Sequence, residues 1–197
     1  PDLLEKLVCD VLPHQHGMDP FRDEQVLTPM RRGELGTIKL NSRLQARLNA
    51  APSAAHRYGE VTFGIGDRVI QQANNYDLGV YNGDTGFVSA IDREEQSLEV
   101  TFDAVRVAYD FDQLDELALA YAMTIHMSQG SEYPAVVIPL TMEHYVLLSK
   151  RLLYTAITRG KRRVILVGED RALKIALRSV RSDSRYSGLA SRLRHYR

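Results

Sequence analysis

Two short segments of the chain combine residue types that can bind a phosphate group. The first, Thr124–Tyr133, places small polar side chains and Gly130 directly after an apolar stretch. Such residues at the end of a strand let backbone N–H groups and hydroxyls approach a phosphate closely. Ligands of open parallel sheets bind beyond the carboxyl ends of the strands, where we expect this segment to lie. Its spacing is equally compatible with an ordinary connection between a strand and a helix.

The second segment, Leu152–Arg163, is a predicted helix with an apolar face, followed by a cluster of cations. Gly160 is a candidate for the residue that ends this helix. Cations at the C-terminus of a helix complement its dipole, and this is the preferred interpretation for the three cations after Gly160. For Arg159, the same structural role and a contact to a phosphate both stay open.

The composition limits the classes of function that the chain can serve. It has 197 residues, with 25 Lys and Arg balanced by 25 Asp and Glu, and a single cysteine, Cys9. The balanced charge excludes wholesale coating of a polyanion, so any contact with nucleic acid must be local. One cysteine excludes a disulfide framework and a multi-cysteine zinc site, and no apolar run approaches the roughly 20 residues of a membrane span. We therefore predict a soluble, cytoplasmic protein with no metal site of its own and no membrane partner.

Hydrophobic periodicity predicts the elements that must position the two segments. Helical spacing predicts helices from Leu3 to Pro13, at Ile38–Leu48, at Lys150–Thr158, at Arg171–Arg178 and near Leu189–Leu193. Apolar runs predict buried strands at Gln25–Thr28, Ala120–Ile125, Ala135–Leu140 and Val164–Val167. This alternation of strands and helices is typical of a domain built on a parallel sheet.

The middle of the chain has a different pattern, with a predicted linker at Ala50–His56 and short alternating segments from Val61 onwards. The predicted strands are Asp67–Gln71, Phe87–Asp92, Leu98–Phe102 and Val105–Tyr109. Turn residues separate them, and this spacing is typical of a small antiparallel barrel of about 50 residues. We therefore predict a parallel-sheet domain formed by residues 1–57 and 110–197, interrupted by a barrel insert at residues 58–109.

Four blocks of the sequence occur in an order that resembles a known family. The first block is Gln25–Gly33, and the second consists of three barrel sequences, Gly66–Gln71, Asn74–Asp77 and Tyr81–Gly86. The third and fourth blocks are the two segments described first, Thr124–Tyr133 and Leu152–Arg163. In this order they resemble motif four, the SH3-like insert, motif five and motif six in the C-terminal part of a RecD-type superfamily 1 DNA helicase, similar to an exodeoxyribonuclease V alpha subunit. The resemblance covers nearly the whole chain. It implies an α/β fold with a RecA-like parallel sheet of the P-loop NTPase type, lacking its own P-loop and interrupted by a small SH3-like β-barrel.

The resemblance also implies that ATP with Mg²⁺ binds between two motor domains, of which this chain is the second. A planar guanidinium reaching in from the second domain suits the charge spread over the γ-phosphate oxygens. Arg159 matches the arginine of motif six, which would be the arginine finger. Arg32, or less favourably Arg31, matches a second basic residue from motif four.

Motif five implies further contacts to nucleotide and to DNA. Near the nucleotide, the matching residues are Glu132 at the ribose, Gly130 for close backbone approach and Gln129 as a link to the DNA. The residues that match contacts to the DNA backbone are Thr124, His126 and Ser128. For His126, an ordinary polar loop residue is the simpler interpretation without the family match.

The barrel offers two residues that could line a single strand of DNA. Tyr76 could stack on a base, and Asn75 could donate or accept through its amide. Polar turn residues are more often structural, and we prefer that interpretation for both residues and for the barrel glycines.

The sequence contains no G-x-x-x-x-G-K-[ST] segment that could cradle ATP phosphates. Gly33 and Gly36 have the wrong spacing, and no apolar strand ends in paired acidic residues for magnesium. By the family pattern, we expect a first motor domain before residue 1. We also expect the chain by itself not to hydrolyse ATP.

The leading hypothesis is therefore ATP-driven translocation on single-stranded DNA, in the 5′-to-3′ direction that the resemblance implies. The expected partners are DNA and the first motor domain, with a nuclease or repair complex as a further candidate. One alternative is the motor region of a conjugative relaxase. Another is a non-enzymatic DNA-binding or docking module that uses the barrel as an adaptor. Arg159 and Glu132 favour the enzyme, because an adaptor needs neither a γ-phosphate contact nor a ribose contact.

Overall fold

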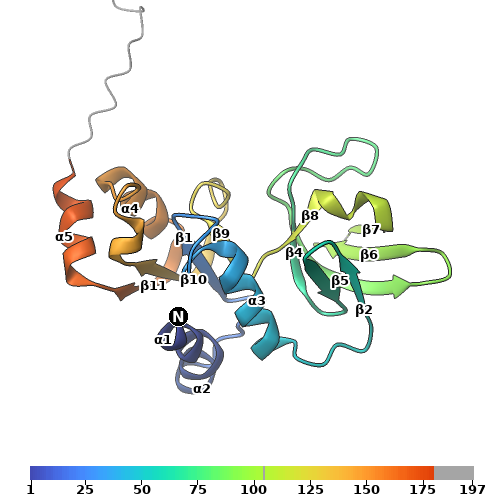
Figure 1. Cartoon of the computed structure of the whole chain (residues 1–197), viewed down its shortest axis with the longest axis horizontal. Coiled ribbons are helices and arrows are strands. Elements are labelled where there is room, and N and C mark those ends of the chain that lie inside the picture. Colours follow the sequence, from blue (N-terminus) through green and yellow to red (C-terminus); the bar gives the residue numbers. More distant parts are fainter. Residues whose placement is uncertain (104, 180–197) are drawn as a thin grey trace, which may run out of the picture.

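The computed structural model describes residues 1–103 and 105–179, so the predicted helix near Leu189–Leu193 lies outside the described residues. Figure 1 shows two parts side by side along the long axis: a helix-flanked parallel sheet and an antiparallel barrel, with helix α3 between them. No helix of the described residues is long and apolar enough to cross a membrane.

The parallel sheet has four strands in the order β11-β10-β1-β9, and every neighbouring pair is parallel. Its strands are β1 (Glu24–Thr28), β9 (Ala122–Thr124), β10 (Tyr133–Leu140) and β11 (Gly160–Gly168). The central strands β1 and β10 are buried almost throughout, as their runs of Val, Leu and Ile predict. The predicted strands within β1, β10 and β11 are confirmed.

The predicted strand Ala120–Ile125 is confirmed, but it is shorter than expected, because the chain leaves another sheet just before it. Its C-terminal part forms β9 of the parallel sheet. The residues just before it, Leu117–Leu119, form β8, which pairs antiparallel with a strand of the barrel. Ala120 and Tyr121 connect the two strands and are buried. A continuous apolar run cannot show where the chain leaves one sheet and joins the next.

The chain begins with one helical segment made of α1 (Asp2–Lys6), a π-helical turn (Leu7–Val11) and α2 (Leu12–His16). We expected Pro13 to close this segment, and that expectation is wrong. Pro13 is the second residue of α2, one residue after the π-helical turn, where a missing N–H is tolerated. The segment ends instead at Gly17, which adopts the left-handed conformation with φ of 61°.

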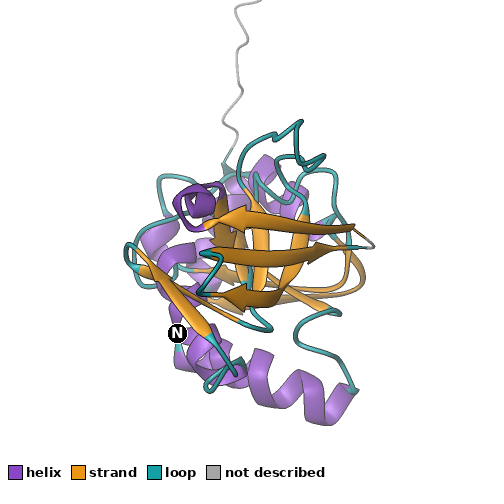
Figure 2. Cartoon of the chain, turned by 90° about the vertical axis from the view of Figure 1, so that its right-hand side faces the viewer, coloured by secondary structure: helices purple, strands orange, loops and turns teal. Residues whose placement is uncertain are grey.

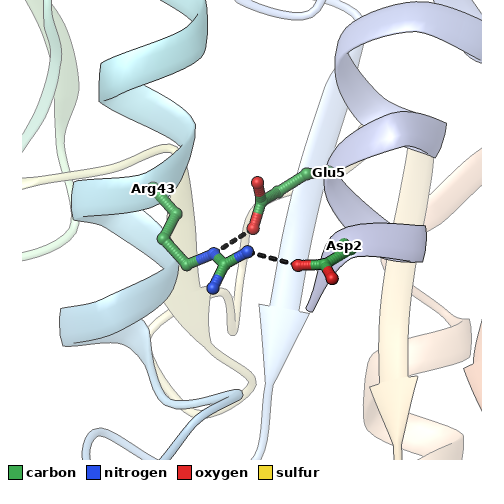
Figure 3. Close-up of polar contacts among 3 residues, drawn as sticks. All are labelled: Asp2, Glu5 and Arg43. Carbon is green, nitrogen blue, oxygen red and sulfur yellow. Dashed lines mark hydrogen bonds and ion pairs between the residues drawn. The ribbon is translucent and has the colours of Figure 1, made fainter.

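Ion pairs attach the first helical segment to α3 (Thr37–Leu48), the predicted helix of this region. Figure 3 shows Arg43 of α3 reaching between Glu5 and Asp2 of α1, with 2.5 Å between Arg43 Nη2 and Asp2 Oδ1. One turn further on, Arg47 donates to both oxygens of Asp10 at 2.9 Å. The arginines are partly exposed, so solvent screens these pairs and each contributes little to stability.

Two helices after β10 complete the parallel-sheet part. They are α4 (Lys150–Ile157), whose first turn is capped by Ser149 Oγ, and α5 (Asp170–Arg178), both as predicted. Gly160 does not end α4, because the helix closes at Thr158 and Gly160 already begins β11. The glycine is needed for close packing. A Cβ there would lie 2.7 Å from Arg163 O and 3.0 Å from Val136 Cγ2.

The barrel, defined here as Ala55–Leu119, faces the viewer in Figure 2. Its strands are β2 (Ala55–Tyr58), β3 (Val61–Gly64), β4 (Arg68–Gln71), β5 (Thr85–Asp92), β6 (Ser97–Phe102), β7 (Val105–Asp110) and β8, with a 3-10 helix, Phe111–Glu116, before β8. β2 and β3 form a hairpin, and the other five strands form a sheet in the order β7-β6-β5-β4-β8. The four predicted barrel strands are confirmed, and the predicted linker Ala50–His56 runs into β2.

The hydrogen-bonded sheet of the barrel extends beyond the predicted insert of residues 58–109, because β8 pairs with β4 at Val69↔Leu119. A buried carboxylate, Asp67, ties this sheet to α3 and to the β8–β9 connection. It accepts hydrogen bonds from Gln45 Nε2 at 2.5 Å, Asn49 Nδ2 at 2.7 Å and Tyr121 Oη at 2.7 Å, besides the N–H of Gly64 in the barrel. The barrel is therefore joined to the parallel sheet by a buried polar network as well as by the chain.

Candidate nucleotide and nucleic-acid site

Arg159 lies between α4 and β11, and its guanidinium is held by hydrogen bonds. Nη1 donates to Ser131 O at 3.0 Å, Nε to Thr155 O at 3.2 Å and Nη2 to Thr158 Oγ1 at 3.2 Å. The carbonyl of Arg159 accepts the N–H of Tyr133 at 2.8 Å. The end of α4 and the loop after β9 are thereby fixed to each other.

The predicted neighbour of Arg159, Glu132, comes to the same edge of the sheet. Its carboxylate lies 3.6 Å from Lys161 Nζ, and both side chains are more than half exposed. Gly130 has φ of 92° and nothing within 4 Å of where a Cβ would stand, so the loop backbone is accessible there. Gln129 is exposed beside it. We call this region, formed by Gln129–Tyr133 and Arg159, the arginine edge.

A groove with a volume of about 570 Å³ lies elsewhere, between the parallel sheet and the barrel. From the parallel-sheet part it is lined by Arg31, Thr124 and Met127, and from α3 and the barrel by residues such as Gln45, Thr62 and Gln72. Its lining mixes polar side chains with apolar ones, and its charged residues are Arg31, Glu60 and Lys39, of which Lys39 forms an ion pair with Glu34. Two predicted site residues, Arg31 and Thr124, are thus brought together here.

The groove and the arginine edge stand at opposite ends of the strands. At the carboxyl end of the strands, Thr28 of β1 pairs with Thr124 of β9. At the amino end, Tyr133 of β10 pairs with Gly160 of β11. Tyr133 lies two residues before Ala135, the partner of Glu24 at the start of β1. At about 3.3 Å per residue, the levels of Thr28 and Tyr133 are roughly 20 Å apart. The motif-five segment begins at the carboxyl ends of the strands, as expected, and runs back to their amino ends.

The two predicted catalytic arginines are therefore not brought together. Arg32 follows β1 in a loop closed by hydrogen bonds from Thr28 Oγ1 to Leu35 O at 2.6 Å and from Thr37 N to Met30 O at 3.1 Å. This loop lies at the end of the strands opposite to Arg159.

Three residues were predicted to touch the DNA backbone, and they differ in accessibility. Thr124 lines the groove, and its Oγ1 accepts the N–H of Met127 at 3.3 Å. His126 is exposed. Ser128 is fully buried, and its hydroxyl donates to Ile125 O at 2.8 Å, which shapes the turn. In this conformation only Thr124 and His126 offer atoms to a ligand.

The two barrel residues also differ. Tyr76 is 76% exposed and makes an edge contact with Tyr81, with 6.0 Å between ring centroids. Asn75 is used within the barrel: its Nδ2 donates to Glu116 Oε2 at 3.1 Å and its Oδ1 accepts from Leu78 N at 3.1 Å. The preferred structural interpretation thus describes the contacts of Asn75, while Tyr76 presents a free aromatic face.

Arg68 is a residue that the sequence did not single out. It begins β4, is 6% exposed, and donates from Nη1 to Glu24 O at 3.0 Å. Its Cζ lies 5.7 Å from the centre of the Tyr133 ring, a cation–π arrangement. Burial lowers the pKa of Arg68, and the Tyr133 hydroxyl opposes that effect. An arginine at the start of an alternating strand ordinarily indicates a surface residue, so periodicity carried no signal for this contact.

Two titratable groups with raised pKa values are the buried Glu24, at the amino end of β1, and the half-buried Cys9. Burial, reinforced by Asp23 and Asp19, raises the pKa of the Glu24 carboxyl to about 8, and neither oxygen has a hydrogen-bond partner. Burial also raises the pKa of the Cys9 thiol to about 11. Within the described ranges, no group of three or more His, Cys, Asp or Glu residues could hold a metal ion.

Comparison with known proteins supplies the family. A model of the SH3 domain of ATP-dependent RecD-like DNA helicases matches residues 40–102, and a model of the UvrD-like helicase C-terminal domain matches residues 119–167. The ATP-dependent RecD2 DNA helicase of Deinococcus radiodurans is 39% identical over 86% of this chain. The RecD subunit of the RecBCD enzyme of Mycobacterium tuberculosis is 35% identical over 87% of it. The chain belongs to the RecD-type superfamily 1 helicases.

This RecD-type chain spans about a quarter of the length of the curated relatives it matches, 23% of the Deinococcus protein and 29% of the Mycobacterium protein. Among solved structures, Pif1 helicase from Bacteroides in complex with ADP-AlF3 and single-stranded DNA aligns with 98% of this chain and 49% of that one, at a TM-score of 0.59 and 17% identity. Pif1 from Candida albicans aligns with 100% and 55%, at 0.55 and 15%. These likenesses show the fold: the expected helicase-type parallel-sheet domain with an SH3-like barrel.

Proposed function

We propose that this chain is the second motor domain of an ATP-driven helicase that translocates on single-stranded DNA, in the 5′-to-3′ direction. In this proposal ATP binds between the chain and a first motor domain that supplies the P-loop and the magnesium-binding acids. The supporting observation is the arginine edge, where Arg159 is fixed beside Gly130 and Glu132 on one side of the sheet. We call the two domains together the complete motor.

Arg159 suits the role of arginine finger for two reasons. Its planar guanidinium presents a rigid fork of donors, which fits phosphate oxygens better than an ammonium does. Its present acceptors are two backbone carbonyls and a hydroxyl, all neutral. A phosphate is a stronger acceptor than these because it is charged. Closing the domains would therefore exchange weak partners for a strong one at the moment of hydrolysis.

The remaining residues of the arginine edge fit a nucleotide. Glu132 can accept hydrogen bonds from ribose hydroxyls once it separates from Lys161, an exposed pair of little stability. Gly130 leaves space for the nucleotide to approach the backbone closely. Gln129 is exposed beside it, in the same loop that begins at Thr124 in the groove. Mg²⁺ would assist by neutralising phosphate charge. Its ligands are assigned to the first motor domain, which carries the acidic magnesium motif in the family pattern.

DNA is proposed to follow the groove. Arg31 and Thr124 can contact backbone phosphates, and exposed His126 lies two residues beyond Thr124. Tyr76 can stack on a base, which is a contact that tolerates any sequence. The chain carries no net charge, so binding depends on these few local groups. Ser128 and Asn75 stay predicted DNA contacts that require their present hydrogen bonds to open.

Arg32 stays a proposed second catalytic arginine, and its position makes the proposal testable. If Arg32 reaches the γ-phosphate in the closed motor, Arg32→Ala lowers kcat and leaves DNA affinity unchanged. If Arg32 acts with Arg31 at the groove end, the same change weakens DNA binding and leaves kcat at saturating DNA unchanged. Steady-state hydrolysis and a DNA titration of one variant therefore assign it to one end.

The partner proposed beyond the motor is a nuclease or repair complex. The Mycobacterium relative is named as a subunit of the RecBCD enzyme, and the Deinococcus relative is named as an ATP-dependent DNA helicase. Co-purification of the complete motor with a nuclease from its own source would support the assembly, and a lone monomer there would count against it.

The deciding experiment removes Arg159 in the complete motor. Arg159→Ala is expected to lower kcat for DNA-stimulated ATP hydrolysis by about 10³–10⁵, the range of an arginine finger. Nucleotide affinity should change little, because the contact is made mainly in the transition state. The matched control is Arg162→Ala, an exposed cation three residues on. A kcat within about threefold of the parent would contradict the assignment, and ATP turnover by the isolated 197-residue chain would contradict the proposed division of labour.

A further inference from the structure

Arg68 is a buried cation whose cost is not met by an ion pair. In the part of the chain that the structure describes, no carboxylate lies within ion-pair distance of it. Its partners are the carbonyl of Glu24 and the face of Tyr133. Burying a guanidinium whose direct contacts are neutral is unfavourable, and the Asp19 carboxylate offsets that cost only in part. The residue therefore calls for a role other than stability.

Arg68 is connected to Arg159 through one residue, Tyr133. Arg68 belongs to the barrel, and the ring it faces belongs to Tyr133, the first residue of β10. The N–H of Tyr133 donates to Arg159 O at 2.8 Å, and Tyr133 pairs with Gly160, the residue after Arg159. The position of one buried ring thus sets the position of the backbone from which the Arg159 side chain extends.

A second contact supports the same path. Ser131, whose carbonyl accepts from Arg159 Nη1, lines a small cavity of about 330 Å³ together with barrel residues that include Gly79, Thr85 and Val105. Tyr133 itself is 6% exposed and packs in one cluster with Ile70 of β4. The barrel therefore packs against Tyr133 and borders a shared cavity with Ser131, and the backbone groups of both residues hold Arg159.

We propose that Arg68 is a positioning residue through which the barrel holds Tyr133, and with it Arg159, in place for hydrolysis. This inference rests on the proposed role of Arg159 as the arginine finger and adds a barrel residue to that same site. Only arginine can both stack a planar cation on the ring and donate to the Glu24 carbonyl in one geometry. The barrel would thus influence the rate of ATP hydrolysis without touching the nucleotide.

The test compares three variants of the complete motor: Arg68→Met, Arg68→Lys and the control Arg106→Met. Arg106 is an arginine of the same barrel whose side chain is 75% exposed. Arg68→Met should lower kcat of DNA-stimulated hydrolysis at least about tenfold, with KM for ATP and affinity for single-stranded DNA unchanged, because only the alignment of a transition-state contact is lost. Arg68→Lys, which keeps the charge over the ring, should recover part of kcat. The control should match the parent.

A double-mutant cycle shows whether Arg68 acts through the ring. If it does, Tyr133→Leu lowers kcat, and adding Arg68→Met lowers it little further. Thermal melting of the same samples separates folding from positioning. A lower melting temperature with kcat within twofold of the parent would overturn the proposal and leave Arg68 a structural residue. Independent, multiplicative effects of the two changes would overturn the path through Tyr133.

The two proposals fail in different ways. If Arg159→Ala leaves kcat unchanged, the arginine finger is wrong whatever Arg68 does. If Arg159→Ala abolishes hydrolysis while Arg68→Met matches the parent, only the inference about Arg68 is wrong.

Discussion

The two ends of the parallel sheet are built differently. At the arginine edge, the guanidinium of Arg159 already has three acceptors, and Tyr133 behind it is buried. At the other end, the exposed Arg31 lines a groove of about 570 Å³, and His126 is exposed two residues beyond Thr124. The same sheet therefore offers one closed end with fixed polar groups and one open end with free ones.

The difference matches two different physical tasks. A charge that must meet a transition state has to be placed in advance, since displacement by about 1 Å can cost 10²-fold in rate. A surface along which a polymer slides needs contacts that release easily and tolerate any sequence. We therefore expect substitutions at the closed end to change turnover or stability sharply, and substitutions at the open end to change affinity mildly.

The largest effect is expected from Arg159→Lys in the complete motor. Lysine keeps the positive charge but loses the planar fork and the three present hydrogen bonds, so kcat should fall by at least about 10². The affinity for single-stranded DNA and its salt dependence should stay at parental values, as measured by fluorescence anisotropy. Equal losses in kcat and in DNA affinity would erase the distinction between the two ends.

Glu24 tests the closed end through pH. Its folded-state pKa is raised from an ordinary 4.5 to about 8 by burial, so the folded protein holds this proton to higher pH than the unfolded chain does. Stability from this group is complete below the unfolded value and is lost as pH rises through about 8. Glu24→Gln should therefore stabilise the chain at pH 9, on the order of a few kcal/mol, and change little at pH 4.

Urea unfolding at both pH values checks this prediction, with the exposed Glu60→Gln as the matched control. A gain at pH 4 that equals the gain at pH 9 would show that the Glu24 carboxyl titrates normally in the folded state.

Two glycines allow a comparison of packing within one site. In Gly160→Ala, the new methyl would stand 2.7 Å from Arg163 O and 3.0 Å from Val136 Cγ2, so we expect a loss of about 1–3 kcal/mol from overpacking. Gly130→Ala meets no atom within 4 Å, and only its φ of 92° opposes it, at about 1 kcal/mol. Denaturant unfolding of both variants measures the difference. A larger loss at Gly130 would mean that the loop is the tighter of the two.

The smallest effect is expected from Arg31→Ala at the open end. Removing one phosphate contact should weaken single-stranded DNA binding by roughly tenfold or less and reduce the slope of log affinity against log salt by about 1. Turnover at saturating DNA should not change. Arg106→Ala, outside the groove, is the control. An unchanged salt slope would remove Arg31 from the DNA path.

The sequence predicted most elements, because their apolar spacing reflects which face is buried. Val136 and Ile138 are buried, and the apolar spacing of α3 places Leu40 and Leu44 in the core, as expected. The errors arose where local pattern does not contain the answer. Pro13 was expected to end a helix because proline normally does so, and the π-helical turn that accommodates it leaves no sequence signature. The split between β8 and β9 falls inside one apolar run.

The sequence indicated which residues belong to the candidate site, but it did not indicate how they are arranged in space. The residue types at Arg159 and Glu132 pointed to one edge, and the strand register brings them there. The same register sends Arg32 to the opposite end, which depends on which strands pair and at what level. Burial of Arg68 likewise depends on how the barrel packs against β1 and β10. These facts are tertiary, and no spacing along the chain encodes them.

The Asp67 carboxylate limits how the barrel can be removed or exchanged. It collects donors from α3, from the β3 end and from Tyr121, which leads into β9. Cutting out the barrel would remove this carboxylate and leave the donors of Gln45, Asn49 and Tyr121 without their acceptor, and a grafted foreign barrel would need its own acceptor at the same point. We expect one cooperative unfolding transition for both parts, and inheritance of the barrel together with α3 and Tyr121 as a single exchangeable unit.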